Sequence, residues 1–376
     1  MIAKDNIYKR RKRKLAVVIY DFEPRGVQRS QIRLANQFSE MGFLVDALVF
    51  RKKGSLVSAL SDDVTVVNFD VSSSKEAFPI IVRYLRKERP IAVLSAEDHV
   101  NLLFIAAKLL LFSSVWVSIS CRVSPQLWAE SPRFGTKPWL TAKLVRWLYP
   151  RSDQVVMLSS GMKCDYIRLF SLTDKRLKVI GNPIIESGFR KSIEAKTHSW
   201  LENKIFPVIM GVGNLSRIKG FDVLLRAFAL ISREIDCRLL LVGDGPERKR
   251  LLALAEELGV SDVVNLMGFH PQPMELMKKA DLFVLSSRSE GFGNVLVEAI
   301  GSGCPVISTR CGGGALEIME HGRLGPLVDV DDVKGLAASI REVLDNPPDP
   351  EMLLASAQRF RTDVVARQYL ANIVSL

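Results

Sequence analysis

The sequence has few cysteines and few metal-binding patterns, and this scarcity excludes several classes of protein. The five cysteines are odd in number and form no CxxC pair: Cys121, Cys164, Cys237, Cys304 and Cys311. A disulfide framework or a zinc site is therefore not expected, and a reducing compartment is favoured. The four histidines are dispersed without metal-ligand spacing, and no DxD-type pair follows a strand in the N-terminal half. We expect no bound metal and no separate cofactor. The acidic pairs at 62–63 and 331–332 are interpreted as solvated or helix-start charges.

Long apolar runs are also scarce. The one candidate for a membrane span is residues 102–119, which Lys108 interrupts. A Ser-Ser pair at 113–114 divides this run into a helix-like piece, 101–111, and a β-rich piece, 115–119, so we predict a buried helix and then a buried strand. The apolar run at 15–20 lasts about six residues, shorter than the roughly 7–15 of a signal peptide. It indicates the first buried strand of an α/β domain.

What remains is an ordinary globular composition in a chain of 376 residues, with 48% hydrophobic and 25% charged residues. That length exceeds what one hydrophobic core usually serves, so two domains are expected. Short apolar runs alternate with helix-length amphipathic stretches, which is typical of a parallel sheet covered on both faces. The first series predicts strands at 15–20, 44–50, 64–69, 91–95, 115–120 and 154–158, with helices at 26–41, 75–87 and 99–111 among them.

This alternation pauses at residues 178–184, where Asn182-Pro183 signals a turn. A polar, linker-like segment, 186–204, follows. A second series then predicts strands at 206–213, 237–242, 263–267, 282–285 and 305–308. We predict two tandem Rossmann-like domains, 1–185 and 186–376, whose last helix can cross back to the first. Ligands of such folds bind at the carboxyl ends of the strands, so an interdomain cleft is the expected site.

Charge is distributed unevenly between the halves. Residues 1–183 hold 30 Lys and Arg against 16 Asp and Glu, whereas residues 184–376 hold 22 against 25. The basic half includes the run Lys9–Lys14 and suggests an anionic partner, either membrane lipid, a lipid-linked phosphate or nucleic acid. The alternative is a merely solvated basic face. The run lacks interleaved aromatic residues and precedes an ordinary strand, which disfavours nucleic acid.

The segment 289–299, SEGFGNVLVEA, carries the strongest chemical pattern. Two carboxylates flank a glycine-rich turn that leads into a helix. Glycines make a continuous helix improbable, so we place Glu290 in the loop, the helix start at Asn294, and Glu298 about one turn in. Backbone N–H groups of the turn would point at a ligand, and carboxylates accept hydrogen bonds from vicinal hydroxyls. Taken alone, the segment is also compatible with a helix start that favours acidic residues.

A second glycine-containing loop, residues 210–222, also follows a predicted strand and leads into a helical pattern at 223–231. Small residues such as Gly213 let the backbone approach a phosphate, while Arg217 and Lys219 can neutralise a diphosphate. The GxGxxS pattern lacks the third glycine of a dinucleotide fingerprint, and no P-loop is present.

Taken together, these segments resemble the retaining glycosyltransferases of the family 4 type, which have the GT-B fold. The resemblance covers nearly the whole chain and is most specific in the C-terminal half: 213–222, 242–247, the EX7E region within 280–298, 303–308, 312–314 and Glu317. It implies transfer of a sugar from a nucleoside diphosphate sugar to an acceptor hydroxyl, with retention of configuration.

The resemblance also implies roles for single residues. Glu298 would hold the ribose and Glu290 the donor sugar, while Lys219 would bind the diphosphate. Backbone groups for the donor are expected at Gly26, Gly213, Asn214, Phe292, Gly293, Asn294 and Val295. Arg122 falls where many members place His or Arg against the sugar. Two positions depart from the family: Asn214 stands where a second phosphate-binding cation is common, and Arg25 replaces the first glycine of the N-terminal loop. Whether Arg217 substitutes for the missing cation stays open.

These observations predict a metal-independent glycosyltransferase of polysaccharide or glycolipid synthesis. Its expected partners are a nucleotide-sugar donor, an acceptor glycan or lipid-linked glycan, and an anionic membrane surface, without nucleic acid. We expect a cytoplasmic protein that can dock peripherally on the inner face of the membrane. The alternatives are a sugar-nucleotide epimerase or a phosphorylase on the same fold, a non-catalytic sugar-binding homologue, or a basic nucleic-acid-binding protein.

Overall fold

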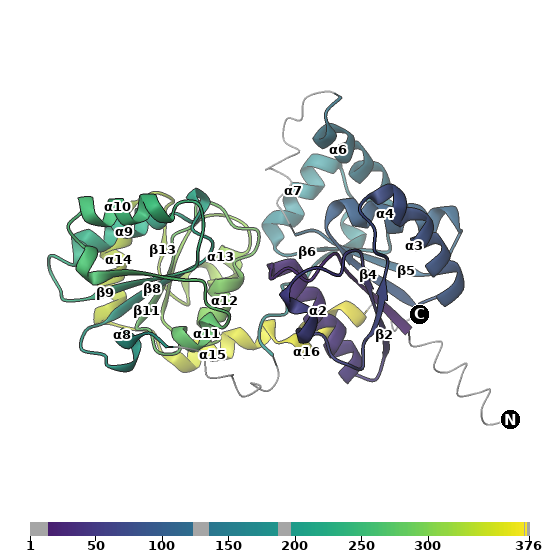
Figure 1. Cartoon of the computed structure of the whole chain (residues 1–376). Helices are drawn as coiled ribbons and strands as arrows, with labels where there is room; N and C mark the ends of the chain where they lie inside the picture. Colours follow the sequence, from purple (N-terminus) through teal and green to yellow (C-terminus); the bar gives the residue numbers. More distant parts are fainter. Residues whose placement is uncertain (1–13, 123–134, 187–196, 372, 374–376) are drawn as a thin grey trace. The chain divides into compact units, whose positions relative to one another are not determined.

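A computed structural model describes residues 14–122, 135–186, 197–371 and 373. It contains two compact units, and the chain divides between residues 186 and 187 (Figure 1). The N-terminal unit comprises residues 1–186 together with 362–376, and the C-terminal unit comprises residues 187–361. The first unit is therefore built from two separate stretches of the chain.

The N-terminal unit is a seven-stranded parallel sheet in the order β3-β2-β1-β4-β5-β6-β7. Its strands are β1 (Lys14–Ile19), β2 (Leu44–Val49), β3 (Thr65–Asn68), β4 (Ala92–Ala96), β5 (Trp116–Ser120), β6 (Gln154–Met157) and β7 (Leu177–Val179). Its helices are α2 (Gly26–Glu40), α3 (Ser74–Glu88), α4 (Asp98–Leu110), α6 (Lys137–Leu148), α7 (Ser160–Phe170) and α16 (Thr362–Leu370). The reversal of strand order at β1 is that of a doubly wound fold, which binds ligands beyond the carboxyl ends of the strands.

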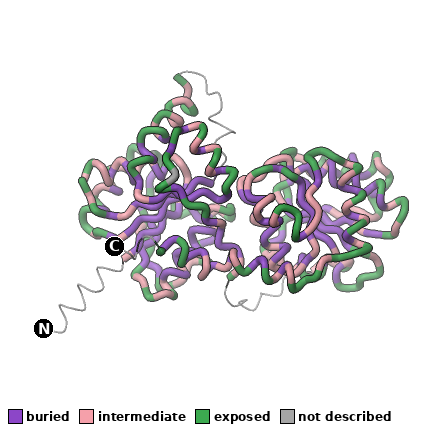
Figure 2. The backbone as a smooth tube through the Cα atoms, turned by 180° about the vertical axis from the view of Figure 1, so that it is seen from behind, coloured by how far each residue is buried: buried purple, intermediate pink, exposed green. Residues whose placement is uncertain are grey.

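The core of this unit is closed by the last helix of the chain. The central strands form buried apolar runs because helices cover both faces of the sheet, as the buried centre in Figure 2 shows. Helix α16 packs on α2 and contributes Val365, Ala366, Tyr369 and Leu370 to the same cluster as the β1 side chains. The backbone N–H of Thr362, where α16 begins, donates to a carbonyl of the first stretch. Helix α16 is thus an integral part of the N-terminal unit.

The C-terminal unit repeats the architecture with six parallel strands in the order β10-β9-β8-β11-β12-β13. Its strands are β8 (Val208–Val212), β9 (Arg238–Val242), β10 (Val264–Gly268), β11 (Leu282–Leu285), β12 (Val306–Thr309) and β13 (Leu327–Val328). Its helices are α8 (Ser199–Glu202), α9 (Phe221–Ile231), α10 (Arg248–Glu257), α11 (Pro273–Met277), α12 (Asn294–Ile300), α13 (Ala315–Ile318), α14 (Val333–Asp345) and α15 (Pro350–Ala357).

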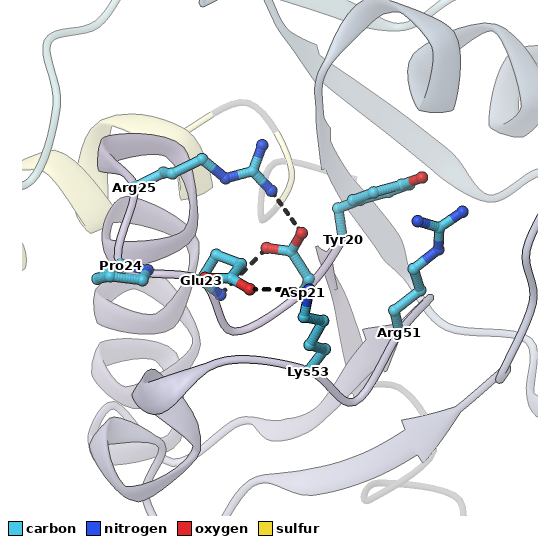
Figure 3. Close-up of a pocket in the computed structure, with 7 residues that line it drawn as sticks. All are labelled: Tyr20, Asp21, Glu23, Pro24, Arg25, Arg51 and Lys53. Atoms are coloured by element: carbon cyan, nitrogen blue, oxygen red, sulfur yellow. Dashed lines mark hydrogen bonds and ion pairs between the residues drawn. The ribbon is translucent and has the colours of Figure 1, made fainter. Parts of the chain in front are cut away.

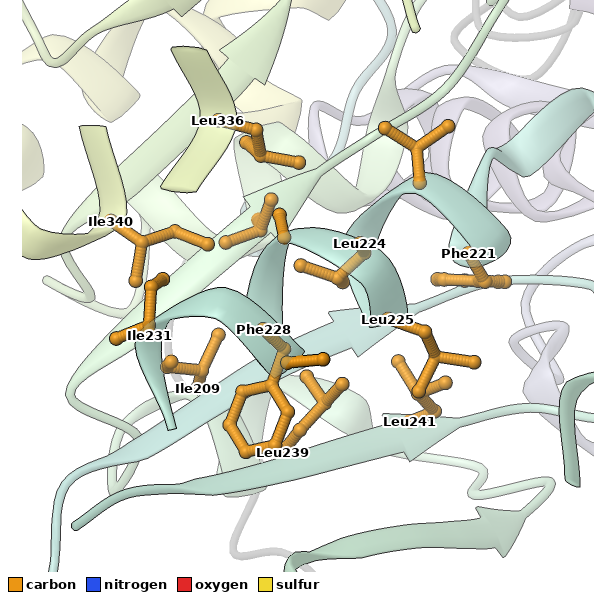
Figure 4. Packing of buried hydrophobic residues seen from close by; sticks show 14 of the residues in the cluster. Ile209, Phe221, Leu224, Leu225, Phe228, Ile231, Leu239, Leu241, Leu336 and Ile340 are labelled. Atoms are coloured by element: carbon orange, nitrogen blue, oxygen red, sulfur yellow. The ribbon is translucent and has the colours of Figure 1, made fainter. Parts of the chain in front are cut away.

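Helix α9 anchors the core of the C-terminal unit. Its apolar face lies on β8 and β9, and Leu336 and Ile340 of α14 pack against it (Figure 4). Leu224 and Phe228, four residues apart on one face of α9, are fully buried. Burying a side chain of this size contributes about 1.5–3 kcal/mol. This packing fixes the start of α9, where the glycine-containing loop ends.

The predicted strands and helices are present with boundaries shifted by one to three residues. Two strands were not predicted: β7, within the stretch where the alternation pauses, and β13. Both are short edge strands, and β7 exposes Lys178 and Val179, so neither shows a continuous apolar run. Of the segment interpreted as a linker, 186–204, residues 187–196 lie outside the described residues. Residues 199–202 of the same segment form α8. The candidate membrane span at 102–119 divides into α4 and β5, and within the described ranges no helix is long and apolar enough to cross a membrane.

Candidate active site

The loops after β8 and β11 meet at the carboxyl edge of the C-terminal sheet and bring two predicted site residues into contact. Lys219 Nζ donates to Glu290 Oε1 at 2.6 Å. Ser287 Oγ donates to the same oxygen at 2.6 Å. The Glu290 carboxylate is 9% exposed and the Lys219 side chain 21% exposed. A cation and a carboxylate that are 71 residues apart in sequence thus form one polar cluster at the edge where ligands of such sheets bind.

Backbone contacts hold these two loops together. The N–H of Arg288 donates to the carbonyl of Ile218 at 2.7 Å, and Ser286 Oγ donates to the carbonyl of Lys219 at 3.0 Å. Gly220 has φ 62°, and a Cβ there would lie 2.0 Å from the Ser286 carbonyl oxygen. Only glycine combines that left-handed conformation with so close an approach. The loop carrying Lys219 is therefore fixed against the loop carrying Glu290.

Arg288 adds a charged clamp that the sequence patterns did not indicate. Its Nη1 and Nη2 donate to the two carboxylate oxygens of Asp222, both at 2.9 Å, and its Nε lies 2.7 Å from Asp331 Oδ1. Nη1 also donates to the carbonyl of Arg217 at 2.6 Å. Burial raises the pKa of Asp222, but the hydrogen bonds and charge of Arg288 outweigh it and hold that pKa below its usual value. Such a bidentate pair fixes both position and orientation.

This clamp corrects the interpretation of the acidic pair at 331–332. Asp332 is the N-cap of α14 and accepts from the N–H of Gly335 at 2.9 Å, as a helix-start charge should. Asp331 instead pairs with Arg288. It belongs to the network around the loop rather than to the solvated surface.

The segment with two glutamates has the local structure predicted for it. Glu290 lies in the loop, α12 begins at Asn294, and Glu298 lies one turn into this helix. Gly293 is the N-cap residue with φ 102°. The ring of Phe292 is buried and forms an edge contact with Phe360, with ring centroids 5.8 Å apart. The Phe292 side chain therefore packs into the core beneath the turn, whereas the Phe292 backbone lies in the loop.

The remaining predicted residues of this unit lie on the same edge. Gly213 borders the Lys219 side chain, because a Cβ at this glycine would lie 3.6 Å from Lys219 Cδ. Asn214 and Arg217 are exposed, and Val295 is half-buried in the first turn of α12. Lys219 thus contacts Glu290 directly, whereas Arg217 is linked to the network through its carbonyl.

Arg122 in the N-terminal unit is more deeply buried than a surface ligand contact requires. It lies two residues after the end of β5 and is 8% exposed. Its guanidinium donates to Asn182 Oδ1 and lies 3.5 Å from Gln31 Oε1, while its Nε has no protein partner among the described residues. The motif around it extends to residues 123–124, which lie outside the described residues. Arg122 connects three segments of the unit: the end of β5, helix α2 and the turn before residue 186.

A buried polar cluster adjoins the carboxyl end of β4. Asp98, the first residue of α4, accepts from the Tyr149 hydroxyl at 2.5 Å. Asn101 donates to the Ser120 carbonyl at 3.1 Å. Burial raises the pKa of Asp98 and also that of the Cys121 thiol, which is fully enclosed. This Cys121 has the chemistry of a core residue, because a raised pKa keeps a thiol protonated and unreactive.

A cavity of about 600 Å³ opens beyond the carboxyl ends of β1 and β2 (Figure 3). Its walls are two loops joined by backbone hydrogen bonds, and the lining residues are Tyr20, Asp21, Glu23, Pro24, Arg25, Arg51 and Lys53. Arg25 donates to Asp21 at 2.5 Å, and Gly26 begins α2 directly behind it. The basic run 51–53 directly after a strand is the sequence signal that could have indicated this cavity.

The basic run near the N-terminus is only partly described. Lys9–Arg13 lie outside the described residues. Lys14 begins β1, and its ammonium lies 2.8 Å from Glu88 and 3.1 Å from Asp46. It is therefore an internal ion-pair residue and not part of a free basic surface. Within the described ranges, no three or more His, Cys, Asp or Glu side chains gather as metal ligands would.

Comparison with known proteins identifies the fold class first. The chain has the GT-B fold: it superposes on Anabaena HepE in complex with UDP with a TM-score of 0.77 at 20% identity, covering 96% of this chain and 100% of that one. It superposes on WaaG, a glycosyltransferase involved in lipopolysaccharide biosynthesis, with a TM-score of 0.67 at 20% identity, covering 96% and 100%. Both likenesses concern architecture alone.

In the sequence comparisons, residues 192–360 match the family model described as glycosyl transferases group 1. A Campylobacter jejuni protein named as a diphospho-undecaprenol 4-alpha-N-acetylgalactosaminyltransferase is 32% identical over 204 residues, 54% of each chain. The lipopolysaccharide core glycosyltransferase LpsD of Rhizobium meliloti is 36% identical over 43% of this chain and 48% of its own. An uncharacterized Haemophilus influenzae glycosyltransferase is 26% identical over 86% and 87%. The chain thus spans about half the length of the first two relatives.

Proposed function

We propose that this protein is a retaining glycosyltransferase of the family 4 type, with 290–298 as its EX7E motif. It moves a sugar from a nucleoside diphosphate sugar to an acceptor hydroxyl in polysaccharide or glycolipid synthesis. The observation that carries the proposal is the contact between Lys219 and Glu290 at the carboxyl edge of the C-terminal sheet. The group 1 match over residues 192–360 supports it, because that segment contains both residues.

The contacts of this cluster suit a donor with a diphosphate and a sugar. In the proposed complex the Lys219 ammonium and the Arg217 guanidinium neutralise the diphosphate, which approaches the small residues at 213–214. Glu290 accepts hydrogen bonds from the sugar hydroxyls and Glu298 from the ribose, while the backbone at 292–295 borders the donor. Preorganised groups of this kind act most strongly where charge develops in the transition state.

The proposed reaction breaks the bond between the anomeric carbon and the diphosphate oxygen. The acceptor oxygen forms its bond on the same face of the sugar, and its proton passes to the leaving diphosphate. Lys219 stabilises the charge that this group gains, so the chemistry needs neither a metal nor a protein nucleophile. The enzyme contributes orientation and charge neutralisation.

The acceptor is proposed to be a glycan or a lipid-linked glycan that binds on the N-terminal unit, where Arg122 and Gly26 lie near the sheet edge. The names of the Campylobacter and Rhizobium relatives point to undecaprenol-linked and lipopolysaccharide-core acceptors for those proteins. A cytoplasmic location with peripheral contact to the inner membrane surface fits such an acceptor.

Thermal unfolding in the presence of single nucleotides tests the donor half of the proposal. The panel comprises UDP, GDP, ADP and CMP with their common sugar conjugates. A ligand at 100 times its Kd adds about 2.7 kcal/mol to the free energy of unfolding. We expect one nucleoside diphosphate and its sugar to stabilise the chain strongly. The absence of any stabilisation would remove the donor site.

The configuration of the product tests retention. With the stabilising donor, nuclear magnetic resonance of the transfer product, or of the sugar released slowly to water, reports its anomeric configuration before mutarotation. The same configuration as the donor is expected. An inverted product would contradict the family 4 assignment, and a donor epimer without transfer would establish an epimerase.

A further inference from the structure

Helix α6 of the N-terminal unit exposes an unusual combination of side chains. Trp139, Lys143 and Trp147 are four residues apart and follow one stripe of the helix, since each step of four turns by about 40°. Leu140 and Arg146 flank this stripe. Leu140 is 53% exposed and Trp147 57% exposed. We call these five residues the α6 face.

The opposite side of α6 is anchored, so the α6 face has a fixed outward direction. Val145 and Leu148 are buried on that opposite side. The helix packs against its neighbours α4 and α7 (Figure 1). A residue of α6 therefore cannot turn inward without breaking the core contacts of the other side.

The charged residues of the segment that carries the α6 face are all basic. Residues 135–151 contain Lys137, Lys143, Arg146 and Arg151 and no Asp or Glu. Lys143 Nζ lies 4.5 Å from the ring centroid of Trp139, and the Arg151 guanidinium lies 4.3 Å from that of Trp147. Each indole of the α6 face, the half-buried Trp139 and the exposed Trp147, thus has a cation beside it. This is the pairing by which amphipathic side chains bridge an apolar layer and water.

Helix α4, which lies beside α6, also exposes apolar side chains. Helix α4 packs beside α6 and ends in Leu110, which is exposed, followed by Phe112, which is 96% exposed. Isolated exposed apolar residues are normal, but indole and leucine side chains interleaved with cations on one helix face are typical of a surface that enters a lipid interface.

We infer that the α6 face docks on an anionic lipid bilayer, with the indoles and Leu140 in the interfacial layer and the cations against the headgroups. Charge favours this occupant, because an acidic partner surface is required and each Lys or Arg near an anionic leaflet strengthens binding. The exposed aliphatic side chain favours lipid over single-stranded nucleic acid, whose bases stack on aromatic rings and whose backbone follows a basic groove. The inference rests on the proposed function in one respect, because docking serves to bring the N-terminal unit to lipid-linked acceptors.

Flotation of the full chain with vesicles tests the docking. Vesicles of phosphatidylcholine alone are compared with vesicles that also contain phosphatidylglycerol. Wild-type protein should float with the anionic vesicles and be released by high salt, because screening acts over about 8 Å at physiological ionic strength. The double variant Lys143→Glu/Arg146→Glu should bind these vesicles roughly thirtyfold or more weakly.

The matched control reverses Arg83 and Arg86 on α3. These two cations are also exposed, also three residues apart on a helix, and belong to the same unit. Arg83→Glu/Arg86→Glu changes net charge equally and should bind like wild type within about threefold. Equal loss in both double variants, or equal binding to neutral vesicles, would overturn the inference.

A second variant keeps the test valid if the charge reversal disturbs folding. Trp147→Phe preserves the apolar bulk, so it should still float, but quenching of tryptophan emission by brominated lipid should fall markedly relative to wild type. Unchanged quenching would show that Trp147 does not enter the bilayer. Displacement of the vesicles by poly(U), lost in the same charge variant, would establish a nucleic-acid surface instead. Nucleotide-dependent stabilisation, measured without vesicles, should be the same in all variants, so a failed donor site and a failed docking surface are distinguishable.

Discussion

The two units share one architecture but place their charged residues in different ways. In the C-terminal unit, the cations Lys219 and Arg288 are tied to carboxylates of neighbouring loops within 3 Å. In the N-terminal unit, the edge of the sheet carries an open cavity bordered by Arg51 and Lys53, and Arg122 is buried in a contact between segments. One sheet edge is thus a closed ionic network, while the other is an open cavity lined by three cations and two carboxylates.

This difference indicates what each unit is built for. A closed network holds its groups in place before a ligand arrives, which is what charge stabilisation in a transition state requires. The open cavity at the other edge leaves its polar side chains accessible to solvent. Substitutions in the two units test this difference. In one unit they should reduce turnover, and in the other they should reduce membrane attachment or stability.

The largest expected effect is on turnover in the C-terminal unit. Lys219→Ala should lower kcat more than a hundredfold, because it removes a preorganised donor at the leaving diphosphate. Steady-state kinetics with the identified donor measure it, and Arg217→Ala, the second proposed diphosphate cation of the loop, is compared with it and should have the smaller effect. Near wild-type activity of Lys219→Ala beside an inactive Arg217→Ala would reverse the assignment within the loop.

The next effect is on nucleotide affinity. Glu298→Gln should weaken binding of the free nucleoside diphosphate by about 1–3 kcal/mol, the usual cost of losing a charge-assisted hydrogen bond. Isothermal titration calorimetry gives the number directly. Glu317→Gln, a second glutamate of the same unit at the start of a short helix, serves for comparison. An unchanged affinity would remove Glu298 from the site.

The Arg288 clamp should give a smaller effect, shared between stability and activity. Arg288→Ala should lower the free energy of unfolding by about 1 kcal/mol, given its partial exposure, and should lower kcat more than it raises the KM for the donor. Denaturant unfolding and kinetics measure both. Since the folded-state pKa of Asp222 is depressed, its stabilising share is present above the unfolded value near 3.8 and is lost as pH falls through the folded pKa. A difference in the free energy of unfolding between wild type and Asp222→Asn that persists below the folded pKa of Asp222 would contradict the clamp.

The smallest expected effect is that of a chelator. Activity should survive EDTA, because basic side chains are proposed to neutralise the diphosphate. The assay compares initial rates before and after chelation and after addition of manganese or magnesium. A complete loss that either metal restores would show that the C-terminal network is not sufficient for the chemistry.

The sequence predicted the C-terminal site better than the N-terminal one for a physical reason. Each strand end, turn and helix start of the segments 210–222 and 289–299 lies within a dozen residues, so local backbone preferences decide them. Gly220, Gly293 and the helix start at Asn294 follow from such preferences. The family 4 roles of Glu298 and Lys219 stay predictions until ligands are tested.

What escaped prediction depends on contacts between distant segments. The Arg288 clamp joins three loops that are far apart in sequence, and the burial of Arg122 depends on Asn182, 60 residues away. The strands β7 and β13 are short and lie at sheet edges, where exposure removes the apolar pattern. Burial of Lys14 against Asp46 and Glu88 likewise has no local signal.

The closing of the N-terminal core by α16 has a consequence for biosynthesis. The C-terminal unit is an insertion into the N-terminal one, because Val365, Ala366 and Tyr369 complete the core that β1 begins. On the ribosome, the strands of the first unit emerge early but lack this helix until residues 362–370 have been made. The inserted unit is contiguous and can complete its fold first, although domains usually fold in order from the N-terminus. Release of the nascent chain before residue 370 would leave the first-synthesised half exposing apolar surface to chaperones and proteases.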